Sequence, residues 1–272
     1  MIQDIGPSKL NNSYVKTAPL PDDTVMAFDG EGKVLADANG GIIRFPTEKE
    51  IHSGNAIYLF GIDENRYFLD LGNNEGAVDG YERYDIRKLR DSGSGKELFA
   101  AFTAYHLWKW YAANIYCGRC KSPLVPDEKE RALRCPGCGN IIYPRINPAV
   151  IVGVTSGDSI LITRYRSGYA HNALIAGFCE IGETLEETVR REVMEEAGIR
   201  VKNIRYYKSQ PWGMAEDLLM GFYCEADGDT DIHMDEGELK YAEWTKRSDI
   251  ALQPSDISLT NEMMRMFKEN RE

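Results

Sequence analysis

The chain has 272 residues, 43% of them hydrophobic, and a formal net charge of −11 at pH 7. This length is sufficient for two domains, and the hydrophobic content is ordinary for a globular protein. The acidic excess disfavours broad electrostatic capture of nucleic acid, and a mean hydropathy of −0.42 without a long apolar run predicts no membrane span.

Residues 1–95 are predicted to form a small, mostly β domain. Short apolar runs typical of strands are separated by Asp-Gly, Asn-Gly-Gly and Asn-Asn-Glu-Gly sequences, which favour turns. The predicted strands are 24–28, 41–45, 56–61 and 66–71. No group of residues in this part of the chain indicates catalysis.

A flexible break with the sequence Asp-Ser-Gly-Ser-Gly at 91–95 ends this domain and offers a cap for the helix that follows. That helix is predicted from Lys96 to about Asn114, because apolar side chains recur there at helical spacing. We therefore assign 96–116 to a connecting helix.

Two Cys-x-x-Cys pairs, Cys117-Gly-Arg-Cys120 and Cys135-Pro-Gly-Cys138, lie within 117–145. Their spacing lets four thiolates reach one tetrahedral ion, which predicts a zinc ribbon with a closed shell and a structural Zn²⁺. A disulfide pair and a rubredoxin-like iron site are the alternatives. The first residues resemble no export signal, which disfavours disulfides and, with reduced thiols, predicts a cytoplasmic protein.

Residues 146–272 are predicted to form a second domain in which strands and helices mix without strict alternation. Strands are expected at 149–154, 159–163, 201–207 and 217–224, and a final helix near 257–270. This order favours an α+β fold or an α/β/α sandwich over a doubly wound sheet.

A short acidic helix in this domain carries the strongest chemical signal. Glu192, Glu195 and Glu196 span about 100° of its surface, so the three carboxylates share one face. Like charges at this spacing destabilise a helix, whereas Mg²⁺ or Mn²⁺ reverses the sign because hard cations bind carboxylate oxygens. The alternative is a solvated acidic helix.

The sequence around these glutamates supports a fixed geometry. Thr184 is a candidate N-cap, and Gly198 lies where a left-handed residue would end the helix. Val189 and Val193 can anchor the opposite face in a core. Arg191 is the cation placed to orient Glu183.

The stretch from Gly177 to Ile199 resembles the Nudix box, Gly-x5-Glu-x7-Arg-Glu-apolar-x-Glu-Glu-x-Gly-apolar, at every defined position. The resemblance implies metal-dependent hydrolysis of a nucleoside diphosphate linked to another group. Glu192 and Glu196 would be the main metal ligands, and Glu195 a ligand or the general base. The implied catalytic set is Glu183, Arg191, Glu192, Glu195 and Glu196.

A four-cysteine ribbon before a Nudix domain and behind a β-rich domain resembles the NADH pyrophosphatase family over roughly 84–265. A third marker is Ser209-Gln210-Pro211-Trp212, which in that family opens a loop of the dinucleotide pocket. After Trp212 this chain departs from the family's proline-rich pattern and continues Gly-Met-Ala-Glu. The departure softens the loop and adds negative charge, and it leaves the preference for reduced dinucleotides open.

The resemblance implies further site residues. Tyr143 and Phe178 match aromatics that flank the nicotinamide ring, and an apolar face on each side suits a planar ring. Ala176, through its backbone carbonyl, and Glu238 match the remaining metal ligands, with Glu236 and Glu243 as nearby competitors for the latter. The implied substrate-binding residues are Tyr143, Phe178, Gln210, Pro211, Trp212, Glu130 and Arg87.

Together these signals predict an α+β chain in which a Nudix α/β/α sandwich, 146–272, follows a zinc ribbon and a small β-rich domain. The implied reaction is hydrolysis of NAD(H)-type dinucleotides to AMP and nicotinamide mononucleotide, extending to the 5′ end of NAD-capped RNA, by a homodimer. One alternative is another Nudix substrate, such as ADP-ribose, a dinucleoside polyphosphate, FAD or a nucleotide sugar. The other is a non-catalytic nucleotide-sensing or nucleic-acid-binding module, which the complete set of carboxylates disfavours.

Overall fold

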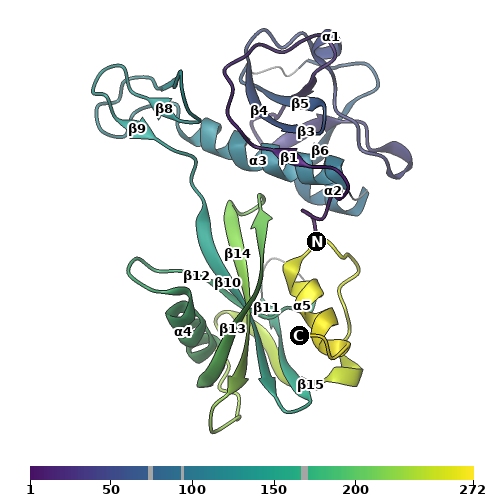
Figure 1. Cartoon of the computed structure of the whole chain (residues 1–272), viewed down its shortest axis with the longest axis vertical. Helices are drawn as coiled ribbons and strands as arrows, with labels where there is room; N and C mark the ends of the chain where they lie inside the picture. Colours follow the sequence, from purple (N-terminus) through teal and green to yellow (C-terminus); the bar gives the residue numbers. More distant parts are fainter. Residues whose placement is uncertain (73–75, 93–94, 167–170) are drawn as a thin grey trace. The chain divides into compact units, whose positions relative to one another are not determined.

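The computed structural model describes residues 1–72, 76–92, 95–166 and 171–272. The chain divides into two compact units (Figure 1). Unit 1 comprises Met1–Ile2, Ile146–Pro211 and Asp217–Glu272, and unit 2 comprises Gln3–Arg145 and Trp212–Glu216. None of the described helices is long and apolar enough to cross a membrane.

Unit 2 contains a four-stranded sheet and a two-stranded sheet. The four strands run in the order β1 (Leu10–Asn11), β4 (Ala56–Ile62), β5 (Asn65–Asp70) and β2 (Thr24–Met26). The other two are β3 (Lys33–Ala36) and β6 (Glu82–Asp85), which pair antiparallel. Their core contains Val25, Leu35 and Phe68, all fully or almost fully buried.

The strands predicted at 24–28, 56–61 and 66–71 are confirmed, whereas the strand predicted at 41–45 is wrong. A 3-10 helix occupies Asn39–Gly41, and beyond it Arg44 forms an isolated bridge with Asp37. Pro46 follows and has no N–H to extend the ladder. Part of the turn predicted after residue 72 lies outside the described residues.

The helices of unit 2 are α1 (Glu48–Ile51), α2 (Ile86–Ser92) and α3 (Lys96–Ala113). Helix α3 has the predicted start, and its N-cap is Gly95, the last residue of the 91–95 break. Large apolar side chains of α3, including Leu98, Phe102 and Trp110, are buried. The ribbon adds a three-stranded sheet of β7 (Val125–Pro126), β8 (Leu133–Arg134) and β9 (Ile141–Ile142).

Unit 1 is built on a six-stranded mixed sheet. Its strand order is β13 (Val201–Trp212), β14 (Asp217–Ala226), β10 (Asn147–Ser156), β11 (Ser159–Tyr165) and β15 (Leu239–Lys246), and β12 (Ile175–Phe178) also pairs with β10. The helices are α4 (Leu185–Ala197) and α5 (Leu259–Lys268), with a 3-10 turn at Arg247–Asp249. Strands β10 and β14 are parallel, and β11 and β12 pair antiparallel with β10.

The two helices cover opposite faces of this sheet (Figure 1). On β10, Val150 and Val152 face the cluster that contains Val193 of α4, while Ile151 faces the cluster that contains Met263 of α5. Alternate residues of a strand point to opposite faces, so a central strand covered on both sides must be apolar throughout. The predicted α/β/α sandwich, its four predicted strands and its final helix are therefore confirmed.

Candidate active site and zinc ribbon

Helix α4 begins and ends where the sequence predicts. A capping box closes its start: the N–H of Glu187 donates to Thr184 Oγ1 at 3.2 Å, and the N–H of Thr184 donates to Glu187 Oε2 at 2.7 Å. The C-cap, Gly198, has a left-handed φ of 70°. Val189 and Val193 are fully buried, so the opposite, acidic face of α4 is fixed.

Arg191 organises the acidic side chains. Its Nε and Nη2 donate to the two carboxylate oxygens of Glu183 at 2.6 and 2.9 Å, the contact predicted from the sequence. Its Nη1 donates to Glu192 at 2.7 Å and to Glu195 at 3.0 Å, and Nη2 also donates to the carbonyl of Phe178. Hydrogen bonds from Arg191 lower the pKa of Glu183 to about 2. The guanidinium therefore positions three of the four acidic side chains.

Glu196 and Glu192 are buried, with relative exposures of 1% and 9%, whereas Glu195 is exposed. Burial raises the pKa of Glu196 to about 8, and it also raises the pKa of Glu192. Both oxygens of Glu196 lie 3.1 Å from the hydroxyl oxygen of Tyr165. Two buried carboxylates with raised pKa values indicate a site that a cation would stabilise.

The backbone at Gly177 makes room for one of these carboxylates. A Cβ atom at this position would lie 1.9 Å from the carboxylate carbon of Glu192 and 2.1 and 2.2 Å from its oxygens. Only glycine leaves that space free, so the side chain of Glu192 reaches directly over strand β12. This close approach explains sterically why the box begins with a glycine.

The oxygen donors fit a hard divalent cation. Glu196 hydrogen-bonds the backbone of Ala176, whose carbonyl oxygen is 3.4 Å from the Tyr165 hydroxyl, and Glu192 lies over the adjacent Gly177. Glu238 is exposed, and its negative charge raises the pKa values of both buried glutamates. Among the described residues, only the four cysteines bring three or more such ligand atoms within 4.8 Å of one another, so the carboxylate oxygens converge less closely than the thiols.

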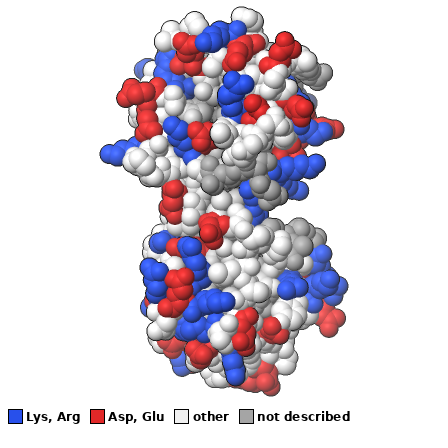
Figure 2. Space-filling model, turned by 90° about the vertical axis from the view of Figure 1, so that its right-hand side faces the viewer, with Lys and Arg blue, Asp and Glu red and all other residues white. Residues whose placement is uncertain are grey.

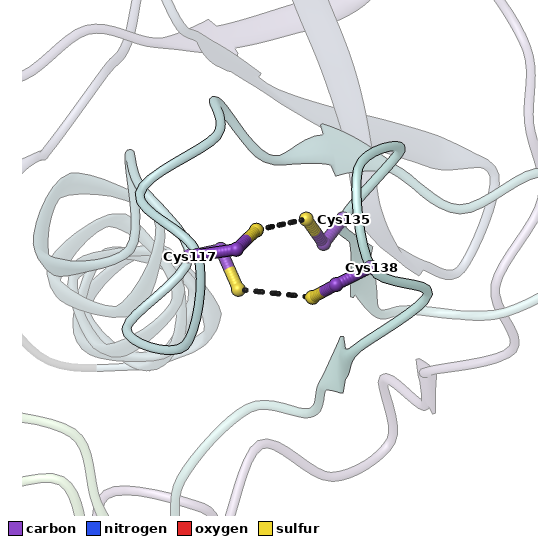
Figure 3. A group of neighbouring side chains, drawn as sticks. Cys117, Cys135 and Cys138 are labelled. Atoms are coloured by element: carbon purple, nitrogen blue, oxygen red, sulfur yellow. Dashed lines mark hydrogen bonds between the residues drawn. The ribbon is translucent and has the colours of Figure 1, made fainter.

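The four cysteines fit zinc closely. The Sγ atoms of Cys117 and Cys138 are 3.7 Å apart and those of Cys120 and Cys135 are 3.3 Å apart, and all four lie within 4.8 Å of one another. Zn–S bonds of about 2.3 Å in a tetrahedron place sulfurs roughly 3.8 Å apart. Hydrogen bonds from Ser122 lower the pKa of Cys120 to about 6, which favours a thiolate. Figure 3 shows the labelled cysteines converging from two facing loops, which supports a closed structural zinc site.

The predicted substrate residues occur in both units. Phe178, at the end of β12 in unit 1, is 53% exposed, and Tyr143 of unit 2 is 54% exposed. The hydroxyl of Tyr143 donates to Glu130 Oε1 at 2.9 Å, which brings two of the predicted substrate contacts together. Arg87 is exposed on α2, and its backbone N–H donates to Asp85.

Gln210 has an internal structural role that the sequence did not reveal. It is fully buried, its side-chain amide donates to the carbonyl of Ile257 and its carbonyl accepts from the N–H of Leu259, both at 2.7 Å. These bonds fix the segment that leads into α5. Pro211, the next residue, is exposed.

The loop after Pro211 is firmly held within unit 2. The ring of Trp212 packs edge-on against Phe102 with ring centroids 5.5 Å apart. Glu216 is buried and pairs with Lys109 at 2.7 Å and with Arg145 at 3.2 Å. Burial opposes ionisation, but these two cations hold the pKa of Glu216 below its usual value. The charge that the departure adds here is therefore compensated, and the expectation of a softened, more negative loop does not describe Glu216.

Tyr165 is the residue of the site that sequence reasoning missed. Its hydroxyl contacts both Glu196 and Ala176, which are 31 and 11 residues away in the chain. It lies at the end of β11, where a tyrosine fits an ordinary strand pattern. No spacing rule connects it to the acidic helix.

A sandwich with an acidic helix on one face, buried glutamates and an open oxygen donor set defines the protein as a hydrolase of the Nudix class. The model of the NUDIX domain matches residues 145–266, and the model of the NADH pyrophosphatase zinc ribbon domain matches residues 113–143. The chain belongs to the Nudix hydrolases that carry this zinc ribbon.

Individual relatives agree with this assignment. The chain is 39% identical to the NAD-capped RNA hydrolase NudC of Escherichia fergusonii over 188 residues, which are 68% of this chain and 67% of that protein. Identity to the protein of the same name from Escherichia coli strain K12 / DH10B is 44% with the same coverage. A NUDIX hydrolase structure from Nitrosomonas europaea has a TM-score of 0.50 at 22% identity, covering 57% of this chain and 90% of that one, and supports the fold.

Proposed function

We propose that the protein hydrolyses the pyrophosphate bond of NAD(H)-type dinucleotides to AMP and nicotinamide mononucleotide, including the NAD cap at the 5′ end of RNA. The observation that carries the proposal is the complete acidic site, in which Glu192 and Glu196 are buried beside Ala176 and Glu238. The two named relatives, both NAD-capped RNA hydrolases, support the substrate class.

Glu192, Glu196, Glu238 and the carbonyl of Ala176 would hold Mg²⁺ or Mn²⁺. When bound, such an ion neutralises pyrophosphate charge and acidifies an attacking water. Glu195 is exposed, with Arg191 at 3.0 Å, so it is accessible either to bind a further ion or to accept the proton of the water. The pair of Glu183 and Arg191 keeps these carboxylates oriented.

Exposed aromatic side chains can recognise the planar ring of the dinucleotide. Phe178 and Tyr143 each present an open ring face, and Glu130 orients Tyr143. On the face shown in Figure 2, acidic and basic side chains are interspersed on both units. The formal net charge of −11 also disfavours extended phosphate contacts, so a capped RNA would be recognised through its NAD cap.

The segment after Trp212 favours one alternative within the same enzyme class. Gly213 lies so close to α3 that a Cβ atom would meet the carbonyl oxygen of Phe102 at 2.0 Å, and Glu216 is ion-paired. A loop packed in this way can select ADP-ribose, a dinucleoside polyphosphate or another nucleotide in place of NADH.

We also propose a division into a β-rich domain (1–95), a connecting helix (96–116), a zinc ribbon (117–145) and a Nudix domain (146–272). A thiolate zinc site requires reduced cysteines, which supports a cytoplasmic protein. A homodimer is proposed on the family resemblance.

Product analysis with Mg²⁺ or Mn²⁺ tests the function. NADH, NAD⁺, ADP-ribose, a diadenosine polyphosphate and an NAD-capped RNA are compared, with Glu196→Gln as the disabled variant. Glu262→Gln is the matched control, because Glu262 is also a buried glutamate but lies on α5, where it pairs with Arg265 and with Lys208 of β13.

We expect AMP and reduced nicotinamide mononucleotide from NADH, lost in Glu196→Gln and retained in Glu262→Gln. Faster turnover of ADP-ribose or the diadenosine compound would replace the proposed substrate by the alternative. Absence of hydrolysis with every substrate would favour a non-catalytic module.

A further inference from the structure

The hydroxyl of Tyr165 joins two proposed metal-binding residues. It accepts the N–H of Ala176 at 3.0 Å and donates to the carboxylate of Glu196, whose oxygens both lie 3.1 Å away. A phenol has one proton to donate, and the Glu196 oxygens at 3.1 Å are nearer acceptors than the Ala176 carbonyl oxygen at 3.4 Å, so the proton is directed to Glu196 while the hydroxyl oxygen accepts from the Ala176 N–H. One atom thus links the carboxylate of α4 to the backbone of β12.

The ring that carries this hydroxyl is held in place. Tyr165 is the last residue of β11, and its ring packs against the apolar cluster beneath α4, which includes Leu161, Val193 and Leu239. Strand β11 is in turn fixed by its ladder with β15. The hydroxyl is therefore presented from a rigid element, as a fixed metal ligand shell requires.

Glu196 depends on this contact because of its neighbours. The nearby charges of Glu238 and Glu192 repel it, its relative exposure is 1%, and its described hydrogen-bond partners are the Tyr165 hydroxyl and the backbone of Ala176. Arg191 is engaged with Glu183, Glu192 and Glu195 instead. The neutral hydroxyl holds Glu196 without supplying a competing positive charge.

We propose that Tyr165 is a positioning residue that fixes the Glu196 carboxylate beside the backbone of Ala176 in the arrangement that binds the divalent metal. This inference rests on the proposed metal-dependent function. Hydrogen-bond partners of metal ligands typically contribute 10- to 100-fold in metal affinity. Loss of the hydroxyl should therefore weaken metal binding to about that extent and leave dinucleotide recognition intact.

The test is direct Mn²⁺ binding to protein freed of Mg²⁺ and Mn²⁺, measured by the electron paramagnetic resonance of free Mn²⁺. Tyr165→Phe removes only the hydroxyl. Tyr207→Phe is the matched control, because the Tyr207 hydroxyl also donates to a glutamate of unit 1, Glu262, at 3.3 Å. We expect the Kd for Mn²⁺ to rise about 10- to 100-fold in Tyr165→Phe and to stay within about 2-fold in Tyr207→Phe.

A double-mutant cycle gives a second readout. In the Glu196→Gln background, Tyr165→Phe should have little further effect on Mn²⁺ affinity, because the hydroxyl acts through that carboxylate. The KM for NADH at saturating metal should stay within about 2-fold of wild type.

Unchanged Mn²⁺ affinity in a folded Tyr165→Phe protein would overturn the inference. So would an equal loss of Mn²⁺ affinity when Tyr165→Phe is introduced into the wild-type protein and into the Glu196→Gln protein. Wild-type protein that binds Mn²⁺ but hydrolyses no dinucleotide would instead refute the proposed function, so the two failures are distinguishable.

Discussion

Replacing Gly177 by alanine tests the geometry of the acidic site most directly. The new Cβ would lie 1.9 Å from the carboxylate carbon of Glu192, whereas ordinary contacts begin at 3.4 Å. The Glu192 carboxylate must therefore retreat by about 1.5 Å, since Gly177 is fixed by its pairing with Val150 on β10. The side chain of Glu192 is flexible enough to do so, so the strain falls on the site and not on the fold.

The expected loss follows from that displacement. A misplacement of about 1 Å in a reacting group can cost roughly 100-fold in rate. We expect kcat on NADH at saturating Mg²⁺ to fall at least about 100-fold in Gly177→Ala. The Tm should change by no more than a few degrees, because the Gly177 backbone is not left-handed and alanine tolerates it. Steady-state kinetics and thermal unfolding measure the two quantities separately.

Gly153→Ala is the matched control. Its Cβ would meet the ring of Tyr223 at 2.7 Å, in the cluster on the α5 face of the sheet. Overpacking there should lower Tm while kcat of the folded protein stays within about 3-fold of wild type. A Gly177→Ala protein that keeps more than about a third of the wild-type kcat would refute the steric argument.

Three further predictions concern pH, zinc and the loop after Trp212. Without Mg²⁺ or Mn²⁺, the unfolded chain loses the Glu196 proton near the ordinary pKa of 4.5 and the folded chain only near 8. The stability that the protonated group contributes is therefore complete below pH 4.5 and is lost as pH rises through about 8. Urea unfolding should show a decrease on the order of 5 kcal/mol across this range, at about 1.4 kcal/mol per pKa unit over about 3.5 units, and Glu196→Gln should abolish the decrease. Cys138→Ser should remove bound zinc, measured by elemental analysis, and lower Tm because the ligand shell is opened; full zinc content in this variant would contradict the assignment. Glu216→Gln should raise the KM for dinucleotide about 5- to 10-fold with kcat nearly unchanged, because charged pairs with Lys109 and Arg145 that position the Trp212 loop are weakened; an unchanged KM would separate this loop from the substrate.

Local rules explain which features the sequence could predict. The start of α4 at Thr184, its end at Gly198 and the contact between Glu183 and Arg191 all depend on residues within one or two helical turns of one another. The two cysteine pairs are similarly short-range. Spacing alone therefore specifies these parts, and the structure shows them as expected.

Long-range pairing explains what the sequence could not predict. Strand β15 (Leu239–Lys246) contains charged residues at every third position, which is not the alternation typical of a strand, and it is recognised as a strand through its ladder with β11. Strand β12 (Ile175–Phe178) is only four residues long, and its antiparallel pairing with β10 places Gly177 beneath Glu192. The 41–45 segment is the reverse case. Its apolar sequence favours a strand, but the structure forms only one isolated bridge there, between Arg44 and Asp37.

The same distinction applies to charge. A sequence shows the sign of Glu216 but not that Lys109 and Arg145, 107 and 71 residues earlier, meet it in the fold. For Gln210, the family pattern indicated the substrate pocket, while its bonds to Ile257 and Leu259 use the amide within the structure. The sequence thus shows the chemical type of a residue, but it does not show which distant residue that side chain contacts in the fold.

The way in which hydrogen-bond donors are distributed among the glutamates of the acidic helix favours binding of an added cation. Arg191 is shared among Glu183, Glu192 and Glu195, whereas the described partners of the Glu196 oxygens are the neutral hydroxyl of Tyr165 and the Ala176 backbone. A second arginine at Glu196 would neutralise that carboxylate and compete with metal. Because the deepest glutamate is held by a neutral donor, no fixed positive charge competes for its oxygens, and a divalent ion can bind them as no described side chain does.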